Sequence, residues 1–200
     1  MSDQAKPTAD LRSRTRRAVQ NEIGALALDL FLERGFADVT VDEICARAGI
    51  SSRSFFRYFA TKEDTVLGRL AQAGTRLQAA LEARPAAEAP WDALRAAFRV
   101  LIAEFAESGV AVRATTRLLL ETPGLRARQL ERQLYWQDLL IPDIARRIGS
   151  GPSGTRELRA RALVASALAC LDAAGVAWAT AEDGSRIETF LDAAFDAVRG

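Results

Sequence analysis

Residues 40–59, TVDEICARAGISSRSFFRYF, constrain the fold of this chain more than any other stretch. Thr40 can cap a helix, and Glu43 three residues later completes a capping-box pattern. Gly49 is suited to the left-handed conformation that ends this helix, and the serines after it can cap a second helix rich in arginine and phenylalanine. Two short helices joined by a glycine-containing turn form the plan of a helix-turn-helix motif.

The second helix of this motif places rings and positive charge on opposite faces. Phe55 and Phe59 lie on one side of a helix that turns by roughly 100° per residue. The two arginines, Arg53 and Arg57, lie almost opposite. Large rings would anchor such a helix while basic and hydroxyl side chains read the major groove. The alternative is a surface helix with two solvated arginines. If the helix reads DNA, its contacting side chains are Ser51, Ser52, Arg53, Ser54, Phe56, Arg57 and Tyr58.

The N-terminal segment concentrates positive charge locally. The run RSRTRR places arginines in or just before the first helix, which suits contact with a phosphate backbone or an arm in a minor groove. We predict a basic flexible arm over residues 1–14 and a helix from about Thr15 to Arg34. The net charge of the whole chain is only +1, so local placement and not total charge indicates DNA binding. The candidate DNA contacts from this segment are Arg14, Arg16 and Arg17.

Composition favours an all-α protein. Apolar residues make up 49% of the chain, and alanine and leucine are commoner than β-branched residues. Residues 162–178 come nearest to a membrane span, but they carry Asp172 and are rich in alanine, so we expect no membrane segment. The polar N-terminus lacks the apolar stretch of a secretion signal, so we expect a cytoplasmic protein. Cys45 and Cys170 fall on apolar helical faces and are expected to be free thiols.

The residue inventory gives little support to catalysis or to a bound metal. Histidine, the commonest general base and metal ligand, is absent, and two isolated cysteines cannot form the usual zinc sites. No glycine-rich phosphate-binding motif occurs in the sequence. We therefore expect no enzyme activity, no metal site and no cofactor.

The sequence after residue 61 predicts a larger helical domain. One long helix is expected over about residues 62–83, and several amphipathic helices follow it. A helix that starts after Pro123 is expected to kink or break at Pro142, and GSGPSG at residues 149–154 is typical of a flexible loop. The last two helices are expected over about residues 155–179 and 185–199.

Residues 25–66, ALALDLFLERGFADVTVDEICARAGISSRSFFRYFATKEDTV, resemble the DNA-binding head of the TetR family of bacterial transcription regulators. The resemblance lies in a first helix that ends in an aromatic-acidic-Arg-Gly-aromatic run, a Thr-capped second helix, an Ala-Gly-aliphatic-Ser turn and an aromatic exit toward a lysine. It implies an all-helical homodimer of about nine helices. It also implies a three-helix DNA-binding domain over residues 15–61 and a ligand-binding and dimerisation domain over residues 62–200.

The resemblance implies roles for individual residues of the head. Thr40, at the cap of the second helix, would contact a phosphate, and Lys62 would clamp the DNA backbone. Residues 51–54 and Arg57 would face the operator.

The sequence departs from the family pattern beside these positions. The family usually has tyrosine and then histidine where this chain has Phe56 and Tyr58. Arg53 stands where glycine is frequent, and Gln20 stands where a basic residue is common. The preferred DNA sequence is therefore not predictable by analogy.

The apolar stripe on the last helix fits either the core of one chain or an interface. With the family resemblance, it implies a four-helix dimer interface made of two helices from each subunit. A two-fold dimer would read a palindromic operator whose half-sites lie about one turn of DNA apart. The residues expected at this interface are Leu168, Leu171, Ile187, Phe190, Leu191 and Phe195.

The resemblance also implies a small-molecule effector held in the C-terminal domain. Aromatic residues at helical spacing can equally be plain core. Arg117 and its neighbour Arg113 can hold an anionic group of a ligand, or they can be solvated or paired within the chain. The candidate pocket residues are Phe98, Phe105, Arg117, Leu120, Trp136 and Trp178.

Together these features favour a homodimeric repressor that a small-molecule effector releases from a palindromic operator. The alternative is a DNA-binding regulator with no inducer, or one that acts as an activator. An enzyme on this scaffold would need a polar cluster around an open cavity, and the sequence contains no such pattern.

Overall fold

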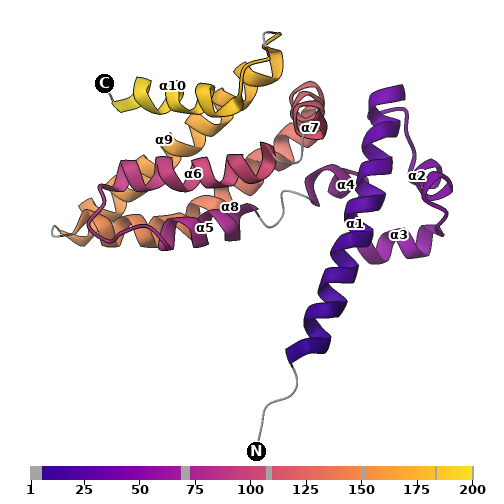
Figure 1. Cartoon of the computed structure of the whole chain (residues 1–200), viewed down its shortest axis with the longest axis horizontal. Helices are drawn as coiled ribbons and strands as arrows, with labels where there is room; N and C mark the ends of the chain where they lie inside the picture. The colour runs from indigo at the N-terminus through magenta and orange to yellow at the C-terminus, as the bar shows by residue number, and fades with distance from the viewer. Residues whose placement is uncertain (1–5, 69–72, 107–109, 150–151, 183, 200) are drawn as a thin grey trace, which may run out of the picture. The chain divides into compact units, whose positions relative to one another are not determined.

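The computed structural model describes residues 6–68, 73–106, 110–149, 152–182 and 184–199. These residues form ten α-helices and no strand, which confirms the predicted all-α fold. The chain divides into two compact units, residues 1–71 and residues 72–200, which we call the head and the body (Figure 1). The sequence had predicted the division at residue 62.

The head contains the helices α1 (Lys6–Arg34), α2 (Val41–Ala48), α3 (Ser52–Tyr58) and α4 (Glu63–Leu67). α1 packs against α2 and α4, and α2 packs against α3. The head buries an apolar core between these helices, to which Phe31, Ile44, Phe55 and Leu67 contribute. Residues 6–14, which we expected in a flexible arm, lie within α1.

The turn between α2 and α3 has the conformation that its glycine predicts. Gly49 has φ 65° and ψ 31°, in the left-handed region that residues with a Cβ atom rarely adopt. Its backbone N–H donates to the carbonyl oxygen of Ala46, and the N–H of Ile50 donates to that of Cys45. These two bonds satisfy carbonyl groups at the end of α2, so the helix stops and the chain turns directly into α3.

α4 belongs to the head because it packs closely on α1. Thr65, Val66 and Leu67 are buried, and a Cβ atom at Gly24 of α1 would lie 3.0 Å from the carbonyl oxygen of Thr65. The absence of a side chain at Gly24 thus lets the two backbones approach. The long helix expected over residues 62–83 is described as two helices, α4 and α5, and residues 69–72 between them lie outside the described part of the chain.

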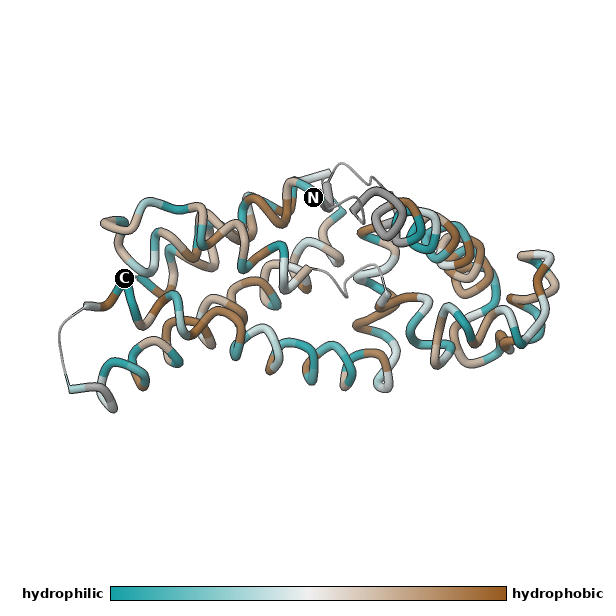
Figure 2. Tube along the Cα trace, turned by 90° about the horizontal axis from the view of Figure 1, so that it is seen from below, coloured by the Kyte–Doolittle hydropathy of each residue, from teal (hydrophilic) through white to brown (hydrophobic). Residues whose placement is uncertain are grey.

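The body contains the six remaining helices, and α9 is their centre. α9 packs against α6, α7, α8 and α10, while α5 packs against α6 and α8. Figure 2 shows apolar and polar residues alternating along these helices, as expected where each helix buries one face. The helices are α5 (Ala73–Glu82), α6 (Pro90–Ala106), α7 (Val110–Glu121), α8 (Pro123–Ile148), α9 (Ser153–Thr180) and α10 (Ile187–Arg199).

α9 is the one long helix of the described chain with a membrane-span composition. Residues Gly154–Thr180 are long and apolar enough to cross a membrane by length and composition, and 33% of the most apolar window is buried in the body. Packing against four neighbouring helices accounts for the buried part of this window, and the rest of it lies outside the core of the body.

We expected α8 to kink or break at Pro142, and the helix continues through this proline to Ile148 without a break. Pro142 is exposed, and its ring therefore displaces no core side chain. A proline inside a helix removes one backbone hydrogen bond, and at an exposed position water can satisfy the carbonyl that loses its partner.

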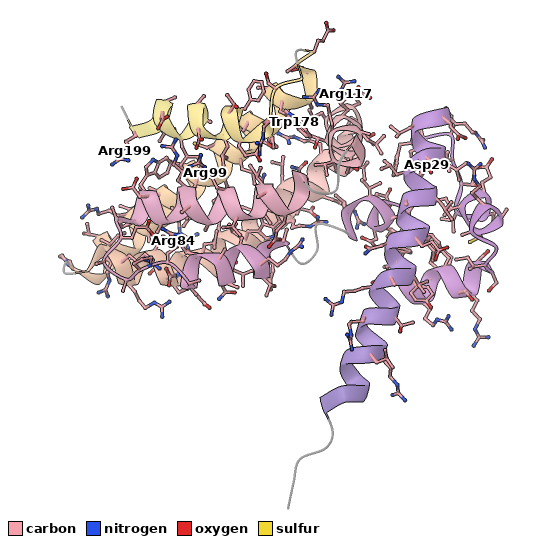
Figure 3. The ribbon with its side chains drawn as sticks, in the orientation of Figure 1. Asp29, Arg84, Arg99, Arg117, Trp178 and Arg199 are labelled. Carbon is pink, nitrogen blue, oxygen red and sulfur yellow. The ribbon has the colours of Figure 1, made fainter. Side chains whose placement is uncertain are left out.

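Ion pairs fasten α10 to α6. Arg95 lies 2.9 Å from Asp192 and 2.6 Å from Asp196, and Arg99 lies 2.8 Å from Asp192. Arg199, at the end of α10, lies 2.7 Å from Asp92 near the start of α6. Figure 3 labels Arg99 and Arg199 beside these two helices.

Arg147, which forms a buried ion pair within α8, fastens that helix to the end of α5. Nε of Arg147 lies 2.6 Å from Asp143, and the two side chains are only 5% and 10% exposed. The guanidinium of Arg147 also donates to the backbone carbonyls of Leu81, Arg84 and Pro85. One arginine thus satisfies both a carboxylate and the carbonyl end of a neighbouring helix.

Trp136 of α8 lies directly on the backbone of α5. A Cβ atom at Gly74 would lie 2.4 Å from Cδ1 and 2.6 Å from Nε1 of the indole ring. Trp136 is 6% exposed and belongs to the main core of the body. Gly74 is therefore needed for close approach of the ring and not for a turn.

Gly74→Ala is expected to destabilise the body by about 2 kcal/mol, because the added methyl group must displace a packed indole ring. Urea unfolding followed by tryptophan fluorescence would measure the change in the free energy of unfolding. Gly124→Ala is the matched control, since a Cβ atom at Gly124 meets nothing within 4 Å. Equal stability of the two variants would contradict the close packing of α5 on Trp136.

Candidate nucleic-acid interface

The start of α2 has the capping box that the sequence predicts. The hydroxyl of Thr40 accepts a hydrogen bond from the backbone N–H of Glu43, and the backbone N–H of Thr40 donates to Glu43 over 2.7 Å. The Thr40 hydroxyl also donates to the Glu43 carboxylate over 2.9 Å. Thr40 is exposed, but its hydroxyl hydrogen is used inside the chain, and a phosphate would have to compete with Glu43 for it.

Glu43 is held in its ionised form. The backbone hydrogen bond from Thr40, then the side-chain bonds from Arg34 and Thr40, lower the pKa of Glu43 from its ordinary value of 4.5 to about 2. The Arg34 guanidinium lies 2.7 Å from the Glu43 carboxylate. The last turn of α1 and the first turn of α2 are therefore joined through one carboxylate.

Glu43→Gln is expected to lower the melting temperature at pH 7, because the neutral amide binds Arg34 and the helix start less strongly. A depressed pKa stabilises the fold above the ordinary pKa of 4.5, and this stabilisation is lost as the pH falls toward about 2. The difference between parent and variant should therefore shrink over that pH range. Thermal unfolding by circular dichroism would test this, with the exposed, weakly paired Glu33→Gln as control. A difference that stays constant with pH would contradict it.

The hydroxyl groups of the three serines at the start of α3 form hydrogen bonds within the head. Ser51 is the N-cap, and its side chain accepts a hydrogen bond from the backbone N–H of Ser54 over 3.2 Å. The Ser51 hydroxyl donates to that of Ser54, and the Ser52 hydroxyl donates to Asp42 of α2 over 2.9 Å. These bonds fix the start of α3 against α2; Ser51 is exposed, while Ser52 and Ser54 are half-buried.

α3 separates its buried and exposed faces as the sequence predicts. Phe55 is completely buried, and its ring centroid lies 5.3 Å from that of Phe59. Arg53, Phe56 and Arg57 are exposed, and Phe56 alone exposes 55% of its surface. Arg53 has no hydrogen-bond or ion-pair partner among the described residues. These three side chains form the part of α3 that is accessible to a partner, which we call the α3 face.

Arg57 and Tyr58 support each other at the end of α3. The Arg57 guanidinium lies 5.0 Å from the centroid of the Tyr58 ring and donates to its hydroxyl over 3.3 Å. A guanidinium on an aromatic face is attracted by the electron-rich ring. Tyr58 is half-buried, so it contributes to the α3 face mainly by orienting Arg57.

The structure gives Lys62 a contact within the head. Its ammonium group donates to the carbonyl oxygens of Phe36 and Val39 over 2.7 and 2.8 Å, and it lies 4.3 Å from the centroid of the Phe36 ring. Lys62 thereby holds the loop between α1 and α2. One of its three N–H groups remains for the phosphate that the family resemblance implies.

The arginines of α1 fall into two groups. Arg14 and Arg17 are exposed on the N-terminal part of α1. Arg16 is also exposed, but its Nη2 donates to the carbonyl oxygen of Arg57 over 2.8 Å. Arg16 therefore contacts α3 as well as solvent.

In the body, Arg117 and Arg113 bind backbone carbonyls. Nε of Arg117 donates to the carbonyl of Ala179 over 2.6 Å, and Arg113 donates to those of Ala181 and Ser185 over 3.3 Å. These carbonyls lie at or just after the end of α9, where a helix leaves acceptors unpaired. Arg117, labelled in Figure 3, thus caps the end of α9 through its Nε, and its role in a ligand pocket stays a prediction.

Trp178 takes part in the same contact. Its indole N–H donates to the carbonyl of Ser185 over 3.0 Å, and the Arg113 guanidinium lies 4.8 Å from the centre of its ring. Trp178 is half-buried, and its polar atom is satisfied within the chain. Its hydrogen bond therefore joins the end of α9 to the segment before α10.

The other predicted pocket residues are distributed through the body. Phe98 is completely buried and lies 6.0 Å, centroid to centroid, from Phe195, so it belongs to the main core. Trp136 is buried against α5, and Leu120 is half-buried. The side chain of Phe105 lies outside the described part of the structure.

The six residues predicted at the dimer interface are either buried or partly buried in the chain itself. Leu168 of α9 and Leu191 and Phe195 of α10 are buried in the core of their own chain, and α10 packs on α6 and α9. The stripe of α10 is thus intramolecular at Leu191 and Phe195, the alternative that the residues alone had left open. Those that are only partly buried are Leu171, Ile187 and Phe190.

Long-range hydrogen bonds to carbonyls are the contacts that the sequence did not reveal. Gln20 donates to the carbonyl of Tyr58 over 2.9 Å across 38 residues of sequence, and Arg16 reaches Arg57 across 41. The sequence around Arg16 and around Gln20 contains no pattern that predicts which carbonyl each side chain binds. The only available signal was the density of long polar side chains on one part of α1.

Both parts of the chain match known families. Residues 23–67 match the family model of bacterial regulatory proteins of the tetR family, and residues 88–200 match the model of the MftR C-terminal domain. The helix-turn-helix head and the helical body thus define a DNA-binding transcription regulator, which is not an enzyme. The chain belongs to the TetR family of bacterial transcription regulators.

Two relatives are similar over most of their length. The chain is 32% identical to the HTH-type transcriptional regulator TcmR of Streptomyces glaucescens, over 91% of this chain and 89% of that protein. It is 31% identical to MftR of Mycobacterium tuberculosis, named for regulation of mycofactocin biosynthesis, over 92% of this chain and 91% of that protein.

A solved structure shares the fold. The repressor FadR of Thermus thermophilus, in complex with lauroyl-CoA, matches with a TM-score of 0.51 at 23% identity, over 90% of this chain and 93% of that one.

Proposed function

We propose that this protein is a cytoplasmic, homodimeric repressor that binds a palindromic operator and is released from it by a small-molecule effector. The observation that carries the proposal is the α3 face. Arg53, Phe56 and Arg57 project from a helix whose opposite side is anchored by Phe55. A short basic helix anchored in this way is suited to the major groove, where arginine recognises guanine.

An exposed apolar stripe on α9 supports the homodimer. Leu158 and Val176 are 67% and 38% exposed, and Ala162, Ala169 and Ala173 between them are exposed as well. These five residues lie on one side of the helix at helical spacing. Small side chains allow close approach of a second helix, so this stripe is the proposed centre of the interface in place of the buried Leu168, Leu191 and Phe195.

Two buried polar atoms on α8 support the effector. Nε1 of Trp136 and Oε1 of Gln129 are buried and have no hydrogen-bond partner in the part of the chain that the structure describes. The two residues are seven positions apart, so they lie on the same side of α8. An unpaired buried polar group is costly, and a bound ligand would satisfy it. The FadR relative binds lauroyl-CoA, which provides a precedent for a ligand in this fold.

Release from DNA would follow from differential affinity. An effector that binds the body more tightly in a geometry unsuited to the operator shifts the population away from the DNA-bound form. The capping contacts of Arg117 and Trp178 favour the alternative, a regulator without an inducer, because they leave fewer polar groups for a ligand.

Fluorescence anisotropy with a labelled duplex from the DNA upstream of the gene tests the proposed function. We expect saturable binding of two subunits, or a multiple of two, per duplex, and at least about 1,000-fold weaker binding to a scrambled duplex of equal length. Sedimentation of the free protein should give a dimer. Equal binding of both duplexes with the same salt dependence would contradict a sequence-specific regulator.

A further inference from the structure

α3 is too short to fix its own C-terminal end. It has seven residues. At its C-terminal end, the backbone N–H of the C-cap residue Phe59 donates to the carbonyl of Phe55. The last carbonyls of any helix lack partners within it, and so short a helix gains little from cooperativity. The end of α3, which carries Arg57, therefore depends on groups from elsewhere in the head.

α1 supplies two such groups one helical turn apart. Nη2 of Arg16 donates to the carbonyl of Arg57 over 2.8 Å. Nε2 of Gln20 donates to the carbonyl of Tyr58 over 2.9 Å. Residues four apart lie on the same side of a helix, so α1 holds the two final carbonyls of α3 as a two-point clamp.

The clamp extends to the side chain of Arg57. The guanidinium of Arg16 lies 5.8 Å from the centroid of the Tyr58 ring, and that of Arg57 lies 5.0 Å from it. Arg57 also donates to the Tyr58 hydroxyl. Fixing Tyr58 through its ring and its carbonyl therefore restricts where the Arg57 guanidinium can lie.

We propose that Arg16 and Gln20 are positioning residues that set the angle of α3 and the orientation of Arg57 for reading DNA. The proposal rests on the proposed role of α3 as the recognition helix. Contacts to base edges depend on orientation, whereas contacts to phosphates depend mainly on charge. Loss of the clamp should therefore reduce sequence discrimination more than non-specific binding.

Gln20 gives the cleanest test because it carries no charge. Gln20→Ala removes one hydrogen bond to α3 and leaves the electrostatic attraction to DNA unchanged. Asn21→Ala is the matched control, since it removes a neighbouring exposed amide from the same helix. Arg16→Ala and Arg12→Ala form a second pair, in which both variants lose one positive charge and only Arg16 is part of the clamp.

Hydrogen exchange of the full chain without DNA is the first measurement. Gln20→Ala and Arg16→Ala should speed the exchange of the amides of residues 55–59 by about five- to tenfold, the factor expected from one lost hydrogen bond. The two controls should leave these rates unchanged, and exchange in the body should not change in any variant. Unchanged exchange of residues 55–59 in Gln20→Ala would overturn the clamp, whatever the DNA result.

Binding to the upstream duplex and to its scrambled counterpart is the second measurement. Gln20→Ala should lower the ratio of the two affinities by about fivefold with no change in salt dependence. Arg16→Ala should lower this ratio as well, and Arg16→Lys, which can still donate to the carbonyl, should restore part of it. An unchanged ratio in Gln20→Ala would overturn the positioning role. If the parent protein does not discriminate between the duplexes, the proposed function fails, and the exchange result still decides whether the clamp exists.

Discussion

Replacing both Arg53 and Arg57 by alanine is expected to weaken binding of the upstream duplex by about 100-fold or more, because each arginine paired with a guanine contributes about 1–3 kcal/mol. Both side chains are exposed on the α3 face, and Arg57 is held in place by Tyr58. Their removal leaves the core side chain Phe55 untouched. Anisotropy titrations at two salt concentrations would measure the loss.

A charge-matched control is needed because any two lost arginines weaken attraction to DNA. Arg47→Ala with Arg186→Ala removes the same charge from exposed positions whose ion pairs lie outside the α3 face. We expect this control to weaken binding of the upstream and the scrambled duplex equally, and by much less than the α3 double variant weakens binding of the upstream duplex. If the α3 variant behaves like the control, the two arginines of α3 act only as solvated surface charges.

Asp143→Ala is expected to destabilise the body by about 3 kcal/mol, because it removes the carboxylate that is hydrogen-bonded to the buried guanidinium of Arg147. The Arg147 side chain is 5% exposed, so water cannot replace the carboxylate. Its bonds to the carbonyls of Leu81, Arg84 and Pro85 would remain and limit the loss. Urea unfolding followed by tryptophan fluorescence reports on the body, since all three tryptophans lie in it.

Arg146→Ala provides the control for this measurement. Arg146 also lies 2.6 Å from Asp143, but its side chain is 71% exposed. An exposed ion pair contributes only about 0–1 kcal/mol, so this variant should be close to the parent in stability. If Asp143→Ala and Arg146→Ala lower the free energy of unfolding equally, the burial of Arg147 does not determine the loss of stability.

The helix-turn-helix was predictable because its determinants are local. The N-caps Thr40 and Ser51 and the turn glycine Gly49 act within a few residues of themselves, and the structure has all three in the predicted conformations. The division of α3 into a face with Phe55 and a face with Arg53 follows from helical periodicity alone. These features require no knowledge of tertiary structure.

The partners of long cationic side chains were not predictable, because they depend on tertiary structure and not on nearby residues. Lys62, Arg16 and Arg117 were expected to meet anions, and in the structure each donates to backbone carbonyls far away in sequence. A long flexible cation can satisfy either kind of acceptor, and the choice depends on which helix end lies within reach. The apolar stripe of α10 was ambiguous in the same way, because an apolar face does not specify its partner.

The contacts between α7 and the end of α9 have a consequence for how the body opens. Arg113 and Arg117 hold the carbonyls of Ala179, Ala181 and Ser185, so α7 cannot slide without breaking several hydrogen bonds at once. Elements joined in this way exchange their amide hydrogens together, as one cooperative segment. α7 and the connection from α9 to α10 should therefore share a single opening free energy, although about 60 residues of sequence separate them.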